Sequence, residues 1–291
     1  MTRAKEVKEV NEVKEKNGGV AAFFDLDGTL VALPSLERRF FRSLRYRREI
    51  PARNYFLWAK EAIRLAPHGI TAILQGNKMH LRGVKVLDES GGGDGDVSPR
   101  HKSGHQAEGQ VSSAPPPRLR RLPVPTFFGQ AMERAMWHAK QGHTIVLVSG
   151  TLETLAREAA RALEAELAAR GITVTIRATA TRLEESDGRW TGRVLGEAMF
   201  GEVKARVAER LAKEIGLDLK RCFAYGDSLN DRWLMAEMGR PAAVNPSIQL
   251  ASIARERGWP ILNWAEEENI TQRRRVHRGI AEKKERHGAI A

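Results

Sequence analysis

The sequence predicts an α/β fold, a doubly wound parallel sheet with an inserted helical cap domain. Short apolar segments alternate with amphipathic helical segments, which is the pattern of a parallel sheet covered by helices. Polar and acidic residues directly follow several apolar segments, where open α/β sheets bind their ligands. A long helical stretch and a polar insert separate the first apolar segment from the next, and this interruption indicates the cap.

The first apolar segment, Val20–Phe24, predicts a buried strand that ends in the run Asp25-Leu26-Asp27-Gly28-Thr29. A strand buried on both faces should carry two acids only where it ends. Side chains at i and i+2 of an extended chain point the same way, and the glycine turn lets backbone N–H groups approach an anion. Paired acids and this turn suit Mg²⁺ and a phosphate, whereas a calcium loop would need further acids after Thr29.

A second apolar segment, residues 143–148, precedes Ser149-Gly150-Thr151, and a helix is predicted from about Thr151. A hydroxyl between a strand end and a helix N-terminus faces free N–H groups and partial positive charge, which favours a phosphate site. The alternative is that Ser149 only caps the helix.

Two further polar segments complete the pattern. Lys204 lies at the start of a predicted helix, and the alternative for it is an ordinary solvated lysine. The apolar segment Cys222–Tyr225 precedes Gly226–Asp231, in which Asp227 and Asp231 are one helical turn apart. Together with Asp25 they would form an oxygen-rich site for Mg²⁺, and a plain helix cap at Asp227 would not explain Asp231.

These four segments resemble the motifs of the haloacid dehalogenase-like (HAD) phosphohydrolases. The run Asp25–Thr29 is similar to the first motif, Ser149 to the second, Lys204 to the third and Gly226–Asp231 to the fourth. The long span between the first two motifs resembles subfamily I. Two segments, Asn77–Gly83 and Ala243–Pro246, resemble its phosphoserine phosphatase-like branch, subfamily IB. The resemblance covers about residues 19–264 apart from the insert, and implies a HAD-like Rossmannoid core.

The resemblance implies a Mg²⁺-dependent phosphatase that works through an aspartyl-phosphate. Asp25 would be the nucleophile and Asp27 the general acid and base. The metal ligands would be Asp25, the Asp27 carbonyl, Asp227, and Asp231 directly or through water. The phosphoryl group would be held by Gly28, Ser149, Gly150, Lys204 and Asn230. The alternatives are a phosphomutase or phosphotransferase of the same fold, or a non-catalytic module that binds phosphate or a partner.

The expected partner is a small phosphorylated substrate. Phosphoserine itself is not favoured, because the cap position near Pro34-Ser35 carries no acid, Glu37 is the nearest one, and the first motif ends in Gly-Thr rather than Ser-Thr. The basic, aromatic cap suggests a larger or more anionic phosphomonoester, such as a lipid headgroup.

Composition limits the class of protein. The 291 residues are 42% hydrophobic, no run of 18 apolar residues exists, and the N-terminus lacks an apolar signal segment. Cys222 is the single cysteine, so we expect no intrachain disulfide and a cytoplasmic protein. The net charge of +12 suggests peripheral contact with an anionic membrane or steering of a phosphorylated substrate. We expect no specific nucleic acid, and the oligomeric state stays open.

The predicted organisation has four parts. Residues 1–18 form a charged N-terminal extension, residues 19–33 and 126–265 the catalytic core, and residues 266–291 a basic tail. Residues 34–125 form the helical cap, with a disordered insert at 88–118. Within the core we predict a helix over 126–141, strands over 173–178 and 242–245, and a hairpin over 183–194 that turns at Asp187-Gly188.

Overall fold

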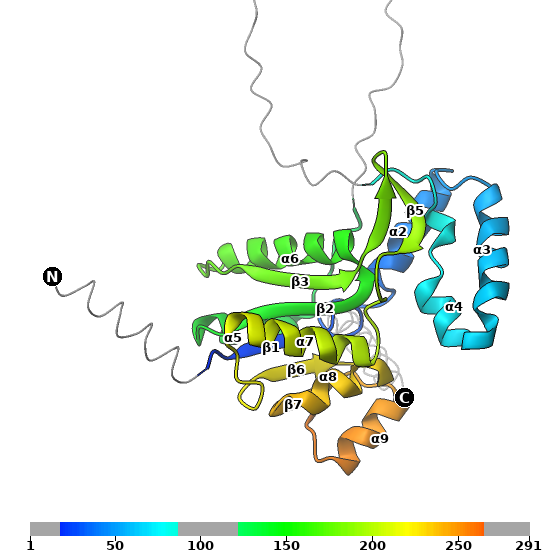
Figure 1. The fold of residues 1–291 in the computed structure, drawn as a ribbon. Helices are drawn as coiled ribbons and strands as arrows, with labels where there is room; N and C mark the ends of the chain where they lie inside the picture. The colour runs from blue at the N-terminus through cyan, green and yellow to red at the C-terminus, as the bar shows by residue number, and fades with distance from the viewer. Residues whose placement is uncertain (1–17, 87–121, 265–291) are drawn as a thin grey trace, which may run out of the picture.

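The computed structural model describes residues 18–86 and 122–264 (Figure 1). The predictions for the N-terminal extension, the insert at 88–118 and the basic tail therefore lie outside the described residues, except for Gly18.

The centre of the structure is a six-stranded sheet in the order β3-β2-β1-β6-β7-β8, in which all neighbouring strands are parallel. The predicted doubly wound parallel sheet is confirmed. The strands are β1 (Ala21–Phe24), β2 (Thr144–Leu152), β3 (Ile176–Thr181), β6 (Phe223–Gly226), β7 (Arg240–Val244) and β8 (Ile261–Leu262).

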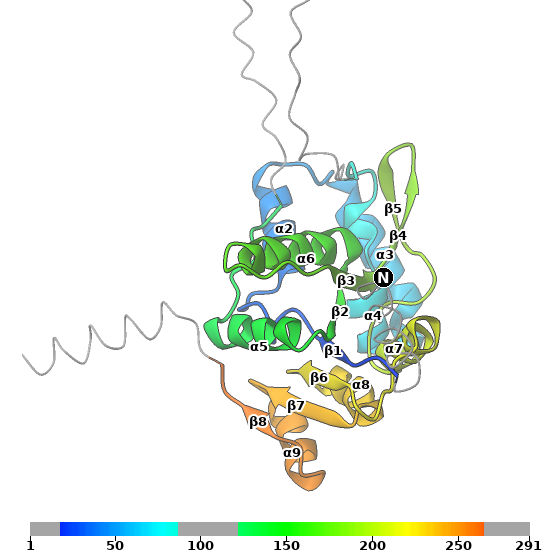
Figure 2. The ribbon, with the colours of Figure 1, turned by 90° about the vertical axis from the view of Figure 1, so that its left-hand side faces the viewer.

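Helices cover both faces of this sheet. On one side lie α5 (Gly129–Lys140) and α6 (Glu153–Ala168), and on the other α7 (Glu202–Ile215), α8 (Arg232–Glu237) and α9 (Ile248–Glu256) (Figure 2). Alternate residues of β1 divide between the two apolar cores: Ala22 and Phe24 belong to one cluster, Ala21 and Phe23 to the other. This alternation is why β1 reads as a continuous apolar run in the sequence.

A second group of elements stands beyond the carboxyl ends of the strands (Figure 1). It consists of α2 (Leu36–Tyr46), α3 (Arg53–Leu65), α4 (Ile70–Gly76) and the antiparallel pair β4 (Leu183–Ser186) and β5 (Arg189–Val194). Helix α2 buries Leu36, Phe40 and Leu44, and the Phe40 ring packs edge-on against Trp190 of β5. We call α2–α4 the cap helices; the domain boundaries themselves stay a prediction.

The predicted hairpin is confirmed, with Asp187 and Gly188 both at positive φ as a two-residue turn of this kind requires. Other boundaries were wrong by a few residues. Strand β2 runs on to Leu152, with an irregular register after Ser149, so α6 begins two residues later than predicted. Strand β3 begins at Ile176 rather than at residue 173, and α8, α9 and β8 were not predicted.

Among the described helices, none has the length and apolarity needed to cross a bilayer.

Candidate active site

The predicted site residues follow strands whose ends lie side by side. Phe24 of β1 pairs with Leu147 of β2 and with Tyr225 of β6, and the Asp25 amide donates to the Tyr225 carbonyl at 2.9 Å. Because these strands are parallel and in register, their carboxyl ends meet at one edge of the sheet. The residues that follow them are therefore brought together although they are far apart in the sequence.

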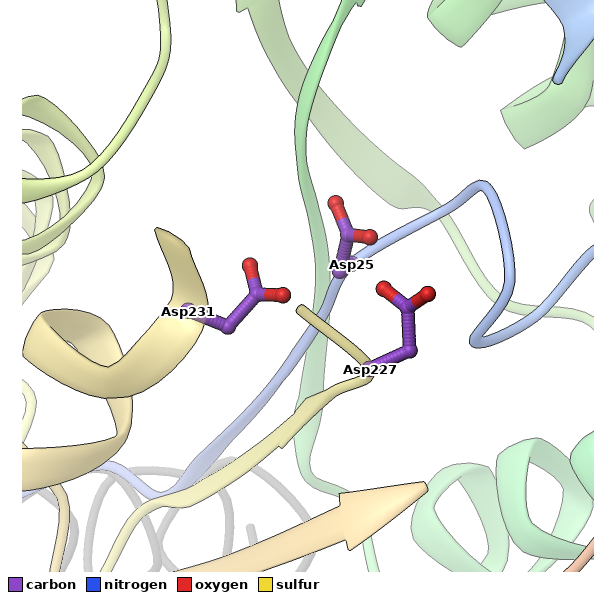
Figure 3. Close-up of side chains that lie close together, drawn as sticks. All are labelled: Asp25, Asp227 and Asp231. Atoms are coloured by element: carbon purple, nitrogen blue, oxygen red, sulfur yellow. The ribbon is translucent and has the colours of Figure 1, made fainter. Parts of the chain in front are cut away.

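Three carboxylates converge at this edge. Asp25, Asp227 and Asp231 each offer an oxygen, and these oxygens all lie within 4.8 Å of one another. Figure 3 shows the three side chains reaching toward a common space from the end of β1, the end of β6 and the short helical turn Leu229–Asp231 (η3). Asp25 and Asp231 are buried, and Asp227 is partly buried.

Lys204 supplies a positive charge to the cluster. Its ammonium nitrogen Nζ donates to Asp25 Oδ1 at 2.7 Å and to Asp231 Oδ1 at 2.6 Å, and the residue is only 2% exposed. Burial opposes the charge, but Asp231 and Asp25 outweigh it and raise the pKa of Lys204. The alternative of a solvated surface lysine is therefore wrong.

The cluster holds three carboxyl groups and one ammonium group, so full ionisation of the carboxyl groups is unfavourable. Burial, reinforced by the neighbouring carboxylates Asp25 and Asp231, raises the pKa of Asp227 to about 9. Burial also raises the pKa of Asp25 to about 7 against the lowering effect of Lys204. Three carboxylates opposed by one ammonium group would be offset by a divalent cation, and their oxygens are the donors that Mg²⁺ prefers.

Asp231 is the most constrained member of the cluster. Its Oδ2 accepts from the Ser228 amide at 2.9 Å and from the Ser228 hydroxyl at 2.8 Å, while Oδ1 accepts from Lys204. Both carboxylate oxygens are thus engaged within the protein. This geometry favours Asp25 and Asp227 as direct metal ligands, with Asp231 acting through water.

Gly28 lets the loop after β1 lie against Asp227. The residue has φ +89°, and a Cβ there would stand 2.2 Å from Asp227 Oδ2. Only glycine accommodates both conditions without displacing the carboxylate. The Gly28 amide donates to the Val31 carbonyl at 2.7 Å, so in this structure it closes the turn.

Asp27 lies at the junction with the cap helices rather than in the cluster. Its Oδ1 accepts from the Leu36 amide at 2.8 Å, at the first residue of α2. Burial raises the pKa of Asp27 to about 6; the Leu36 amide opposes this shift, and the negative charge of Glu37 adds to it. Sequence reasoning missed this contact, although Ser35 as the helix cap was a signal for a helix beginning at Leu36.

Ser149 and Gly150 lie in the last part of β2, beyond Leu147, which pairs with Phe24 of β1. Ser149 is buried, and its hydroxyl accepts from the Thr151 amide at 3.3 Å. A Cβ on Gly150 would stand 2.3 Å from the Phe200 ring, so this aromatic side chain packs directly on the glycine. The remaining predicted residue, Asn230, lies partly buried in η3.

The cap contributes a buried ion pair that the sequence did not reveal. Lys78, buried in the segment before the 3₁₀ turn Met79–Leu81 (η2), pairs with Glu37 of α2. The Asn77–Gly83 segment had been singled out only for its resemblance to the subfamily. Its partner across 41 positions could not be inferred from local pattern.

Comparisons with known proteins agree with this architecture. Residues 108–236 match the model of the haloacid dehalogenase-like hydrolase family. Phosphoserine phosphatase SerB1 of Mycobacterium tuberculosis H37Rv is 40% identical over 129 residues, which are 44% of this chain and 39% of that protein. A second protein of that strain, named probable phosphatase, is 32% identical over 164 residues, 56% of this chain and 53% of that one. This chain therefore spans about half or less of the length of these curated relatives.

A solved phosphoserine phosphatase structure, with an analogue of the phospho-aspartyl intermediate, superposes with a TM-score of 0.50. It is 19% identical, and the match covers 88% of this chain and 99% of that one; at this identity the likeness shows the fold. We conclude that the chain has the fold of these phosphatases, and that residues 108–236 are similar to the haloacid dehalogenase-like hydrolases, including a phosphoserine phosphatase.

Proposed function

We propose that the protein hydrolyses a phosphate monoester by transferring the phosphoryl group to Asp25. The observation that supports this most is the buried contact between Asp25 and Lys204 inside a cluster of three carboxylates. A carboxylate is a nucleophile that needs no base to activate it once it is ionised. The ammonium group beside it is placed to pair with a phosphoryl oxygen as the reaction begins.

The residues that would hold Mg²⁺ are Asp25 and Asp227, with the Asp27 carbonyl and, through water, Asp231. The cluster's oxygen donors fit this ion, and the raised pKa of Asp227 shows that its carboxylate is costly to ionise unless a cation offsets it. Bound there, Mg²⁺ would offset the repulsion between the carboxylates and an anionic phosphate and would favour ionised Asp25.

The proposed reaction has two steps. An Asp25 oxygen attacks phosphorus and the bond from phosphorus to the ester oxygen breaks, while Asp27 gives its proton to the departing alkoxide. Asp27 then removes a proton from a water molecule that attacks the aspartyl-phosphate, releasing phosphate and free Asp25. A pKa of about 6 suits Asp27 to both roles near neutral pH. Lys204 and Ser149 would hold the phosphoryl oxygens.

The leaving group would emerge next to the cap. Asp27 contacts the start of α2, and Glu37 is close enough to act on its charge. Glu37 is already paired with the buried Lys78, so its charge is offset before any substrate arrives. This pairing favours a small phosphomonoester other than phosphoserine, whose ammonium group would need an unpaired acid.

The test distinguishes the proposed role of Asp25 as nucleophile from that of Asp27 as general acid and base. Asp25→Asn should lose at least about 10³-fold in p-nitrophenyl phosphate hydrolysis, because an amide cannot form the phosphoenzyme. Asp27→Asn should instead accumulate the phosphoenzyme, since water attack would lack its base. Intact mass after rapid acid quenching would detect the phosphate adduct, and the double variant Asp25→Asn/Asp27→Asn should show none.

Asp187→Asn is the matched control, because Asp187 is exposed in the hairpin turn and asparagine tolerates its φ of 52°. This control should keep wild-type turnover. Full turnover by a folded Asp25→Asn protein, judged by circular dichroism, would overturn the proposal.

A further inference from the structure

The hairpin formed by α3 and α4 displays large apolar side chains that no part of the described structure covers. Of the thirteen residues of α3, Asn54 is the buried one, and its side chain donates to the carbonyls of His80 and Arg82. The hairpin is thus tied to the rest of the cap by polar contacts. The most exposed apolar residues on it are Phe56 (72%), Ile63 (76%), Ile70 (68%) and Leu74 (65%).

These side chains are spaced as stripes. Phe56 and Ile63 are seven positions apart on α3, and Ile70 and Leu74 are four apart on α4, so each pair shares one face of its helix. The apolar stripe of a helix normally faces a core. Here both helices stand at the outer edge of the molecule, on the side away from the sheet (Figure 1). Large apolar side chains left exposed at helical spacing on two neighbouring helices are typical of an interaction surface.

The same part of the chain is strongly basic. Residues 34–86 carry twelve arginines and lysines and three glutamates, an excess of nine in a chain whose net charge is +12. On α3 the exposed Lys60 lies between Phe56 and Ile63 in the sequence. Its long apolar stem can lie along an apolar phase while the ammonium group stays at a polar boundary.

The positive charge of the cap helps to decide which molecule covers the exposed apolar side chains of α3 and α4. A second copy of the chain would bring the same positive cap against itself. A nucleic acid would pair with the arginines but offers no apolar phase for isoleucine and leucine. The insert at 88–118 contains Val97 and Val111 as its only large apolar residues, so it has little with which to cover the hairpin.

An anionic lipid surface supplies both negative charge and an apolar phase. We propose that the α3–α4 hairpin docks the protein peripherally on an anionic bilayer, with Phe56, Ile63, Ile70 and Leu74 entering the boundary between headgroups and acyl chains. This inference goes beyond the proposed phosphatase activity and does not depend on it.

The experiment measures sedimentation of the full chain with lipid vesicles. Wild type should bind vesicles of phosphatidylcholine and phosphatidylserine and leave vesicles of phosphatidylcholine alone unbound. Phe56→Ser/Ile63→Ser should weaken binding by about tenfold, because two apolar side chains lose their burial in lipid. Lys60→Glu should weaken it by at least about fivefold, and raising the salt should weaken it further.

Ile248→Ser is the matched control, because Ile248 is an equally apolar residue, 91% exposed, on α9 of the core. It should bind as wild type does. Hydrolysis of p-nitrophenyl phosphate by the Phe56→Ser/Ile63→Ser variant would report an intact core. If wild type lacks that activity, circular dichroism serves instead and the docking result still stands.

Three outcomes would overturn the proposal. Wild type could fail to bind anionic vesicles. Binding could survive unchanged in Phe56→Ser/Ile63→Ser, which would place it elsewhere, for example in the basic residues 273–286. Size-exclusion chromatography with light scattering could also show a dimer that this variant splits, which would make a second copy of the chain the occupant of the surface.

Discussion

Lys204 shows how one buried charge organises the candidate site. Its ammonium group joins Asp25, which follows β1, to Asp231 of η3, and both partners are themselves buried. A buried charge is tolerated only where opposite charges and hydrogen bonds replace its water. Removing the lysine would leave its two carboxylates packed together without that compensation.

We predict that Lys204→Met lowers the free energy of unfolding by about 3 kcal/mol at neutral pH when EDTA removes divalent ions, as measured by urea denaturation. The difference from wild type should shrink as the pH falls, because protonation neutralises the stranded carboxylates. Lys213→Met, an exposed position on the same helix, should change stability by less than about 0.5 kcal/mol. A loss below about 1 kcal/mol for Lys204→Met would show that the ion pairs do not stabilise the site.

At the scale of elements, His138 joins α5 to the sheet. Its Nε2 lies 3.0 Å from the Tyr225 hydroxyl on β6, and its Nδ1 lies 2.9 Å from Nδ1 of His143. The ring also packs edge-on against Phe24 of β1. Burial, together with the nearby His143 and Arg134, lowers the pKa of His138 to about 3, so the native protein holds this ring neutral.

The stabilising effect of the neutral ring should be lost in acid. This stabilisation is present in full above the ordinary histidine pKa of 6.5, where His138 is neutral in the unfolded chain as well. It falls as the pH drops toward about 3, because the unfolded chain then binds a proton that the folded protein does not. His138→Gln should therefore flatten the dependence of unfolding free energy on pH by about 1.4 kcal/mol per pH unit between roughly pH 4 and 6. Urea titrations at several pH values measure this slope. His68→Gln, in the exposed turn before α4, should keep the wild-type slope, and equal slopes for both variants would contradict the assignment.

At the scale of the whole molecule, the sheet brings distant segments to one edge. The residues of the acidic cluster come from positions 25, 227 and 231, and Lys204 reaches them from α7. Closing such long loops costs chain entropy, which the buried sheet and its two apolar cores offset. Any ion that binds the assembled cluster and not the unfolded chain must therefore stabilise the entire fold.

We predict that Mg²⁺ raises the unfolding temperature of wild type by about 5–10 °C over the value in EDTA when it is present at about 100 times its dissociation constant. Asp227→Asn should lose most of this increment. In EDTA the variant should be at least as stable as wild type, because the Asp227 carboxylate of wild type is costly to ionise when no cation is bound. Asp187→Asn should keep the full increment. Differential scanning fluorimetry is the measurement, and an equal increment in Asp227→Asn would exclude this carboxylate as a ligand.

Much of the site could be predicted because it follows from local pattern. Acids that end an apolar strand must lie at the sheet's carboxyl edge, and this places Asp25 and Asp227 without any coordinates. The turn at Asp187-Gly188 was likewise readable from two residues. The apolar spacing of α3 is that of a helix packed against a core, but the structure shows Phe56 and Ile63 exposed. Periodicity reports which side chains could be buried, but not whether anything is there to cover them.

The sequence by itself determined the parallel sheet, the order of its motifs and the chemical nature of the candidate site, because each depends on residues close together in the chain. The tertiary structure alone decided that Lys204 is buried between two carboxylates, that the Leu36 amide meets Asp27, and that Lys78 pairs with Glu37. Those contacts join segments whose spacing no local pattern encodes. They depend on how whole helices and strands pack against one another, which a local sequence pattern does not specify.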